Sequence, residues 1–419
     1  MNGFPQTINT MKIYLYTIIL LINISSVINA QGVKLSSENY LEVDTWEMDR
    51  LGFSSNNPAM FSMREYCPSV KDQGNASSCV GWSTAYGAMT IIYNIKYDFS
   101  PSIIKKSNLA FDPNFIYSII YSTNKNDCSE GTLPSDAMDA LKNHGCKRMM
   151  IPQLTNCNTP INETSLYFGE PFRIKEYYRP PSSYINGSND EKIDMLKTSL
   201  ANKNPLLIGA QTTRSMNKAS QTNGLWDSFS SENSDGGHAM CLIGYDDEKF
   251  GGAFEIMNSW GEDWGDQGFL WMKYNDFIRN VDQIYMIETY DVKSTIVNDL
   301  KCLVGDCVNE YSLIFYNKNS FYEGQFSNGQ KDGFGLHHLE NGDEYMGKWQ
   351  NNKKEGNFYY YNIKMNKFYL QLYESDKLID EESLGFVQKK SPDNNLLLEL
   401  FENHQFNGHI NVGDKDDID

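Results

Sequence analysis

The pattern of apolar and polar positions predicts three helices in the first half of the chain. At residues 85–97, apolar side chains recur at helical and near-continuous spacing, which indicates a largely buried helix that begins near Cys79. A second helix is predicted from an N-cap at Ser135 to a stop at Gly145. A third is expected at 191–204, where a proline follows directly.

Short apolar or aromatic runs follow these helices, and they indicate β-strands. Each run is bounded by Gly, Asn or Asp, which are residues that end strands and form turns. Helices therefore come first and strands second, which is the pattern of an α+β fold whose two halves segregate. The predicted strands lie at 205–211, 238–246, 252–260, 268–274 and 284–291.

Beyond Lys301 the chain repeats itself with a period of 23 residues, the spacing between Tyr322 and Tyr345. The segment YEGQFSNGQKDGFG from Tyr322 aligns with YMGKWQNNKKEGNF from Tyr345, and a fainter copy begins at Phe368. A period in this range signals stacked supersecondary units. Aromatic residues alternating with glycine suit hairpin strands, and SNGQKDG supplies a turn. We therefore predict a small antiparallel β-meander at the C-terminus.

Length and charge narrow the class of protein. The 419 residues exceed one average domain, and a hydrophobic fraction of 40% is enough for a sizeable core. The 36 basic and 54 acidic residues give a formal charge of −18. Because no basic stripe is present either, the composition argues against a protein that binds nucleic acid through phosphate contacts.

The first 30 residues have the layout of a secretory signal peptide. Lys12 precedes an apolar run at 13–22, and polar and small residues lead to Ala30. The alternative, a membrane anchor, needs an apolar run of about 20 residues, which is longer than this one. We therefore expect a protein that is secreted or delivered to a lysosomal or vacuolar compartment.

Eight cysteines in a chain of the secretory pathway imply disulfide bonds. If Cys79 is free for chemistry, an odd number remains, so at least one further thiol must be unpaired. Cys241, in the apolar run HAMCLIGY, is the expected buried free thiol. The sequence leaves the connectivity open, and our hypothesis pairs Cys67 with Cys128, Cys146 with Cys157 and Cys302 with Cys307.

Three separate segments contain the residue types that thiol chemistry requires. Cys79 follows the turn QGNASS and begins the first predicted helix, whose dipole favours a thiolate. His238, in DGGHAMCLIGYD, can act as general base and then as acid. Asn258, in IMNSWGEDWGDQGF, can accept the proton of the second ring nitrogen, and Gln73 can direct its amide at an oxyanion.

Each of these residues also has an ordinary structural explanation. A cysteine in an apolar helix is usually a packing residue, and a histidine in a Gly-rich turn usually lies at the surface. An asparagine before Ser-Trp-Gly fits turn chemistry. The conjunction of all four residues, in this order and context, favours the chemical interpretation.

At residues 63–291 the chain resembles the papain family of cysteine peptidases, through CPSVKDQGNASSCVGW, GGHAMCLIGYD and MNSWGEDWGDQGFLWM. The resemblance implies a papain-like fold with a helical lobe and a β-barrel-like lobe. It implies that Cys79 is the nucleophile, His238 the base and Asn258 the orienting residue. Gln73 would be the oxyanion-hole donor.

The resemblance also implies roles for neighbouring segments. Trp260 would shield the histidine and asparagine from water, and NDCSEGTLPSDAMDAL would line the substrate cleft. Trp82 comes three residues after Cys79 rather than directly after it, which indicates a divergent branch, and the long helical inhibitory pro-region of the family has no evident counterpart. Sequons that mark candidate glycosylation sites begin at Asn75, Asn162 and Asn186.

The implied function is a cysteine-type endopeptidase that hydrolyses peptide bonds through a thioester acyl-enzyme, without a cofactor or metal. Its partners would be peptide or protein substrates. Exopeptidase action and acyl transfer use the same residues and stay open. The competing interpretation is a catalytically inactive papain-like scaffold that binds partners through its C-terminal repeats.

The C-terminal copies resemble membrane occupation and recognition nexus (MORN) repeats. This resemblance implies either contact with a protein or lipid partner or a strand appendage packed on the catalytic domain. The expected plan is a signal peptide at 1–30, a short segment at 31–62, a peptidase domain at 63–295, a linker at 296–320, repeats at 321–380 and an acidic tail at 381–419.

Overall fold

The computed structural model describes residues 32–47, 57–106, 109–121, 128–149, 161, 166, 168–227, 236–290, 295–297, 300–365 and 367–386. The predicted signal peptide, the sequon at Asn162 and the acidic residues after 386 lie outside this part of the chain. Within it, no helix is both long and apolar enough to cross a membrane.

One continuous helix runs through the helical lobe from Cys79 to Lys96, and its residues are buried as far as Asn94. Polar residues fit this burial because the hydroxyls of Ser83 and Thr84 donate to carbonyls one turn earlier. The predicted buried helix that begins near Cys79 is confirmed. It consists of α3 (Cys79–Gly81), the π-helical η3 (Trp82–Met89) and α4 (Thr90–Lys96).

The second predicted helix is α7 (Pro134–His144). Pro134 lies in its first turn, where a missing backbone N–H costs nothing. Ser135 therefore lies inside the helix, and its prediction as N-cap is wrong. The predicted stop at Gly145 is confirmed, since its φ of 68° suits glycine.

The third predicted helix, α10 (Asn189–Ala201), begins slightly earlier than expected, at a capping box between Ser188 and Glu191, and ends at Ala201 rather than at the predicted residue 204. The remaining helices are α2 (Ser37–Glu42), α5 (Pro101–Lys106), α6 (Pro113–Ile120), α9 (Ser182–Asn186), α11 (Tyr274–Asn280) and the 3-10 segments η2 (Arg64–Tyr66), η4 (Glu170–Phe172), η5 (Arg214–Gln221) and η6 (Lys249–Gly251).

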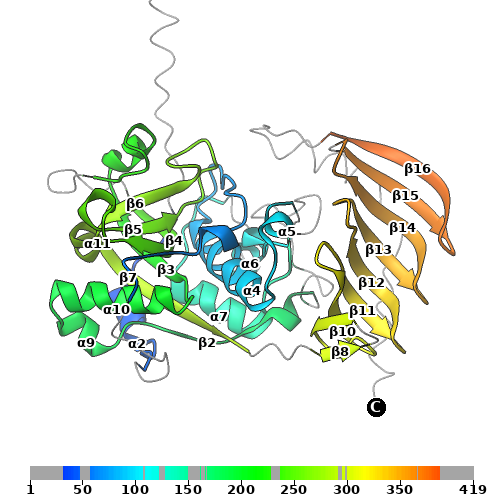
Figure 1. Cartoon of the computed structure of the whole chain (residues 1–419), viewed down its shortest axis with the longest axis horizontal. Helices are drawn as coiled ribbons and strands as arrows, with labels where there is room; N and C mark the ends of the chain where they lie inside the picture. The colour runs from blue at the N-terminus through cyan, green and yellow to red at the C-terminus, as the bar shows by residue number, and fades with distance from the viewer. Residues whose placement is uncertain are drawn as a thin grey trace, which may run out of the picture.

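A seven-stranded antiparallel sheet forms the other lobe, with the order β2-β7-β3-β4-β5-β6 and with β1 paired to β4 (Figure 1). All five predicted strands are present. β4 is buried along most of its length, which explains its nearly continuous apolar sequence. The strands are β1 (Met60–Ser62), β2 (Ile174–Tyr178), β3 (Leu206–Thr212), β4 (Gly236–Asp246), β5 (Ala253–Met257), β6 (Phe269–Lys273) and β7 (Val281–Thr289).

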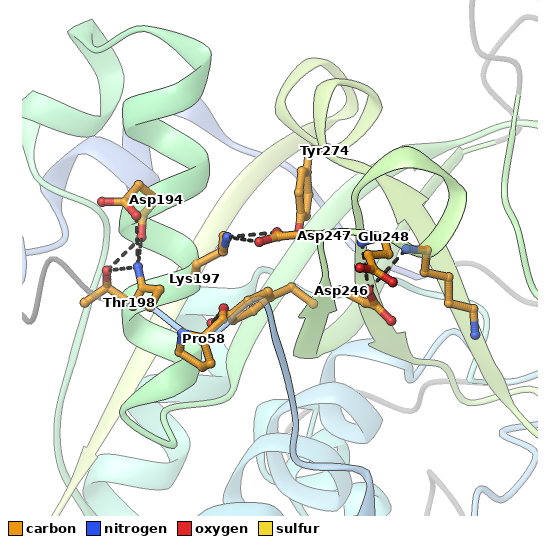
Figure 2. Close-up of polar contacts among 11 residues, drawn as sticks. Pro58, Asp194, Lys197, Thr198, Asp246, Asp247, Glu248 and Tyr274 are labelled. Carbon is orange, nitrogen blue, oxygen red and sulfur yellow. Dashed lines mark hydrogen bonds and ion pairs between the residues drawn. The ribbon is translucent and has the colours of Figure 1, made fainter.

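A polar network fixes the C-terminal end of β4. Asp247, the next residue, accepts hydrogen bonds from Lys197 of α10 (2.8 Å) and from the hydroxyl of Tyr274 at the start of α11 (2.6 Å). Figure 2 shows both side chains directed at this carboxylate. The contacts tie two helices to the strand that carries His238 near its other end.

A second antiparallel sheet follows, in which nine strands pair in sequence order as a meander (Figure 1). The predicted β-meander is present and is larger than expected. Residues 296–320, expected as a linker, contribute β9 and β10, and β16 extends into the expected tail. The strands are β8 (Thr295–Val297), β9 (Leu300–Val304), β10 (Tyr311–Asn317), β11 (Ser320–Ser327), β12 (Gln330–His338), β13 (Glu344–Gln350), β14 (Lys353–Asn362), β15 (Lys367–Glu374) and β16 (Lys377–Phe386).

Equivalent turns explain the sequence period of this sheet. The turns 328–329, 351–352 and 375–376 have positive φ at both residues, as two-residue hairpin turns of type I′ require. Each of the later turns is also bonded to the strand that follows the preceding turn. The second residue of the middle turn donates its N–H to the Lys331 carbonyl (2.9 Å), and the last turn donates in the same way to Lys354 (2.9 Å).

The repeat sheet packs on the helical lobe through one face. Phe315 of β10 lies against Phe99, with ring centroids 5.2 Å apart, and Tyr311 lies against Phe168 at 5.7 Å. Residues of both parts belong to one continuous hydrophobic core. Of the two interpretations of the repeats, an appendage packed on the main domain is therefore present; contact with a further partner stays a prediction.

The disulfides differ from two of the three predicted pairings. Cys302 and Cys307 are bonded as predicted. Cys67 and Cys146 are free thiols, so their pairings with Cys128 and Cys157 are wrong. Cys128 is itself disulfide-bonded, to a residue other than Cys67.

The thiols of Cys67 and Cys146 donate hydrogen bonds to backbone carbonyls instead. Cys67 Sγ donates to the Met63 carbonyl (3.5 Å), and Cys146 Sγ donates to the Asp112 carbonyl (3.3 Å). Both side chains are buried in the core. The prediction that Cys241 is a buried free thiol is confirmed.

Candidate active site

Backbone pairing brings two segments that lie far apart in the sequence to the start of the central helix. Residues 71–73 meet 259–261 in an antiparallel bridge. Beside the bridge, the Gln73 N–H donates to the Ser259 carbonyl (2.8 Å). The turn that precedes Cys79 is thereby fixed against the segment that follows β5.

Cys79 is the first residue of the central helix, and its side chain is fully buried. Its sulfur accepts a hydrogen bond from the N–H of Ala239 (3.4 Å), the residue after His238 on β4. The thiol of the helical lobe thus contacts the strand of the other lobe. The helix N-terminus and this N–H both favour negative charge on the sulfur.

His238 is hydrogen-bonded through Nε2 to Oδ1 of Asn258 (2.8 Å). Because an amide oxygen only accepts, Nε2 carries the proton and Nδ1 is the basic nitrogen. Nδ1 has no hydrogen-bond partner among the described residues. The Trp260 ring is stacked on the imidazole at 4.9 Å between centroids, and Trp264 packs edge-on against Trp260 at 5.0 Å.

Gln73 lies beside the start of the central helix, and both the oxygen and the nitrogen of its carboxamide are hydrogen-bonded. Its Oε1 accepts a hydrogen bond from the Ser259 hydroxyl (2.5 Å). Its Nε2 donates to the carbonyl of Ala76 (2.9 Å), within the loop that leads to Cys79. Asn75 in this loop is exposed, so the predicted sequon points to solvent.

Burial keeps the thiol and the imidazole neutral in this conformation. Burial raises the pKa of Cys79 to about 11, although backbone N–H groups near the sulfur act to lower this pKa. It lowers the pKa of His238 to about 4, against an opposing effect of the Asn258 hydrogen bond. At neutral pH both groups are therefore uncharged, whereas a reactive ion pair needs thiolate and imidazolium.

An N-terminal strap, which we define as residues 32–35, lies against this part of the site. The backbone N–H of Gly32 faces the Cys79 sulfur and acts to lower the pKa of that thiol. The Val33 N–H donates to the carbonyl of Gly237, directly before His238 (3.2 Å). The strap therefore covers the thiol and the start of β4 together.

On its other side the strap pairs with the predicted cleft segment. Thr132 donates its N–H to the Gly32 carbonyl (2.7 Å) and accepts from the Lys34 N–H (2.8 Å), which gives a parallel bridge centred on Val33. The fit requires glycine at 32, because an added Cβ would lie 2.0 Å from the Ser77 carbonyl oxygen. The strap thus bridges Thr132 and Gly237 with its own backbone, and we call the space that it occupies between these two segments the groove.

Gly32→Val in the full-length chain is expected to displace the strap. Opening the groove raises the population of the accessible thiol, so alkylation of Cys79 should accelerate at least about tenfold. Mass spectrometry of iodoacetamide-treated protein over time measures this rate.

Lys34→Ala is the matched control, because that side chain is 53% exposed and makes a surface ion pair with Glu130. It should leave the alkylation rate unchanged. Equal rates for Gly32→Val and the unmodified chain would show that the strap does not restrict access.

Two elements of this site were missed by sequence reasoning. Residues 32–35 show no periodicity that marks them as a cleft-filling segment, because their role depends on tertiary contacts alone. Ser259 had a usable signal, since it stands between two residues that both contact His238. No cluster of three or more His, Cys, Asp or Glu side chains able to hold a metal occurs in the described part of the chain.

Comparison with solved structures gives several papain-like matches. A cysteine protease from Xylella fastidiosa, xylellain, has 21% identity, a TM-score of 0.47, and coverage of 62% of this chain and 96% of that one. Digestive procathepsin L 3 of Tenebrio molitor has 16% identity, a TM-score of 0.45, and coverage of 63% and 77%. ProCathepsin B S9 from Trypanosoma congolense has 14% identity, a TM-score of 0.44, and coverage of 64% and 89%. No curated protein matches the chain by sequence.

Comparison with family models is more specific. The papain family cysteine protease model matches residues 57–292, which is more than half of the chain and includes every candidate residue described above. The MORN repeat model matches residues 322–344 and 345–357, on the second sheet. The chain therefore belongs to the papain family of cysteine proteases, with MORN repeats following its protease domain.

Proposed function

We propose that this protein is a cysteine endopeptidase in which Cys79 is the nucleophile, His238 the general base and acid, Asn258 the orienting residue and Gln73 an oxyanion donor. The observation that carries the proposal is the 2.8 Å hydrogen bond between His238 and Asn258. The next residue of the strand after His238, Ala239, places its N–H against the Cys79 sulfur. The His238–Asn258 bond leaves Nδ1 as the basic nitrogen, as proton removal from a thiol requires.

In the acylation step, His238 takes the thiol proton, and the Cys79 sulfur attacks the carbonyl carbon of a peptide bond. The carbonyl electron pair moves to oxygen, where the N–H of Gln73 Nε2 and the Cys79 backbone N–H stabilise the negative charge. As the C–N bond breaks, His238 donates its proton to the leaving amine. The products are a thioester on Cys79 and a free amine.

In the deacylation step, His238 removes a proton from water, and the resulting hydroxide attacks the thioester carbonyl. The C–S bond breaks, and Cys79 leaves as thiolate with a carboxylic acid as the second product. Asn258 holds the imidazole in one tautomer throughout. Trp260, stacked on the ring, keeps water from competing for the His238–Asn258 bond.

We further propose that the protein acts on peptides or proteins outside the cytosol, in a secreted or lysosomal or vacuolar setting. The family membership and the predicted signal peptide support this setting. Incubation of the Gly32→Val chain with a peptide library, followed by mass spectrometry of the products, tests the reaction. Internal cleavage supports an endopeptidase; cleavage of terminal residues alone, or no cleavage, contradicts it.

Asn258→Ala is expected to lower kcat by about a hundredfold, because a misplaced imidazole costs that much in a positioned reaction. Steady-state kinetics with a cleaved peptide measures the effect. Asn94→Ala is the matched control: that residue is also buried and donates to the Tyr66 carbonyl (2.8 Å), near the opposite end of the central helix from the thiol. It should lose stability and keep its kcat. A large fall in Tm for Asn258→Ala with unchanged kcat would mark Asn258 as structural.

A further inference from the structure

The turn before Cys79 carries a sequon, Asn75-Ala76-Ser77, that the proposed reaction does not use. The asparagine of a sequon is the acceptor of an N-linked glycan. The Asn75 side chain is exposed, and it makes no hydrogen bond within the described part of the chain. Gly74 beside it also faces open space, since a Cβ added there would meet no described atom within 4 Å. The carboxamide of Asn75 therefore has room for a large substituent.

The turn that carries Asn75 is held at both ends. On one side, the Gln73 N–H donates to the Ser259 carbonyl (2.8 Å). On the other side, the Ser77 N–H donates to the Cys128 carbonyl (2.7 Å). The three residues between these anchors cannot move far without breaking one of the two bonds. The place at which the Asn75 side chain leaves the surface is therefore fixed.

The groove borders the same turn. The Gly32 N–H faces the Cys79 sulfur, and a Cβ added to Gly32 would lie 2.0 Å from the Ser77 carbonyl oxygen. Asn75 is two residues before Ser77, so at most about 7 Å of extended chain separates the two. A group attached to Asn75 thus stands at the end of the groove that Gly32 marks.

We propose that Asn75 carries an N-linked glycan, and that this glycan obstructs large molecules on their way to Cys79 while small ones still enter the groove. An N-linked glycan is bulky and extends from the surface into solvent. It would therefore restrict access by size and leave the catalytic residues in place. The proposal rests on the secretory setting and on the peptidase function proposed above.

The modification joins Asn75 Nδ2 to the anomeric carbon of an N-acetylglucosamine residue. The co-reactant is an oligosaccharide linked to a lipid through pyrophosphate. The bond from the anomeric carbon to the pyrophosphate oxygen breaks, and the lipid pyrophosphate leaves with the electron pair. Nδ2 loses one proton to a base of the transferase, so atoms and charge balance.

Occupancy of Asn75 is tested on the full-length chain, made in a eukaryotic host with its own first 30 residues. Trypsin releases residues 72–96, a peptide with one sequon. We expect this peptide to carry a glycan. Treatment with peptide N-glycosidase in heavy-oxygen water should convert the acceptor asparagine to labelled aspartate, which mass spectrometry locates. A peptide that carries no glycan would overturn the proposal.

The effect on access is tested by alkylation of Cys79 with iodoacetamide and with a maleimide attached to a long polyethylene glycol chain. Gly32→Val is present in every variant to open the groove. Asn75→Gln should accelerate the bulky reagent at least about fivefold and iodoacetamide less than about twofold, because the glycan blocks only large encounters. Enzymatic removal of the glycan from the folded chain should give the same result, so the test does not depend on the folding of the variant.

Asn186→Gln is the matched control. Asn186 is also an exposed sequon asparagine, but it ends α9, outside the segments that border the groove. Its replacement should change neither alkylation rate. Equal rates for the bulky reagent with and without the glycan on Asn75 would overturn its role in access.

Hydrolysis separates this proposal from the peptidase function. Removal of the glycan should raise kcat/KM for casein at least about fivefold and leave kcat/KM for a short peptide within about twofold. Alkylation requires no hydrolysis. A chain whose alkylation by the bulky reagent depends on the glycan, but which cleaves neither substrate, would contradict the peptidase function alone.

Discussion

Cys79→Ala is expected to abolish peptide hydrolysis by the open-groove chain, with a loss of about a millionfold in kcat. The sulfur is the atom that forms the covalent intermediate, so no neighbouring group can replace it. The residual rate would come only from binding and the oxyanion donors. The measurement is the rate of product formation at saturating peptide, with circular dichroism to show that the variant is folded.

Cys241→Ala is the matched control for this experiment. Cys241 is also a buried free thiol, on β4 three residues after His238, and burial raises its pKa well above the ordinary range. It is not one of the proposed catalytic residues, so its replacement should leave kcat within about twofold. The lost packing should lower the free energy of unfolding by about 1–2 kcal/mol. Equal losses in the two variants would contradict the assignment of Cys79.

Glu323→Ala is expected to destabilise the full chain by about 3–5 kcal/mol, because it leaves a buried arginine charge without its partner. Glu323 of β11 accepts from Arg148 (3.4 Å) and from the Tyr311 hydroxyl (3.0 Å). The two ionic side chains are 4% and 2% exposed. The Arg148 guanidinium lies over Phe111, 4.3 Å from the ring centre, so it cannot move to water without breaking the packing.

Urea unfolding measures this loss, and Glu170→Ala is its control. Glu170 forms an exposed ion pair with Arg173, with side chains 63% and 45% exposed, and should cost at most about 1 kcal/mol. A loss for Glu323→Ala no larger than this would mean that the repeat sheet does not share a core with the protease domain. Separate unfolding transitions for the two parts would lead to the same conclusion.

The fold was largely predictable because its main elements carry strong local patterns. The central helix from Cys79 is apolar on nearly every side, and the runs that form β3 to β7 are short, apolar and bounded by turn residues. The repeat sheet was predictable from its period, since each turn has the same backbone requirement. Residues 311–317, YSLIFYN, also have a strand-like composition, which the expected linker overlooked.

The candidate site was predictable only in part. Cys79, His238, Asn258 and Gln73 lie in motifs, so their residue types and context could be recognised. The strap and the free state of Cys67 depend on which segments meet in space, and no local pattern encodes those contacts.

The most direct test of the central claim is covalent labelling by an epoxide inhibitor of thiol proteases, with the modified residue identified by mass spectrometry. The Gly32→Val chain should be labelled at Cys79 and not at Cys241, since burial holds the second thiol protonated. Labelling should be lost when His238→Ala removes the base. Labelling that persists equally in Cys79→Ala, or an open-groove chain that neither reacts nor cleaves peptides, would contradict the assignment of Cys79 as the nucleophile of a cysteine peptidase.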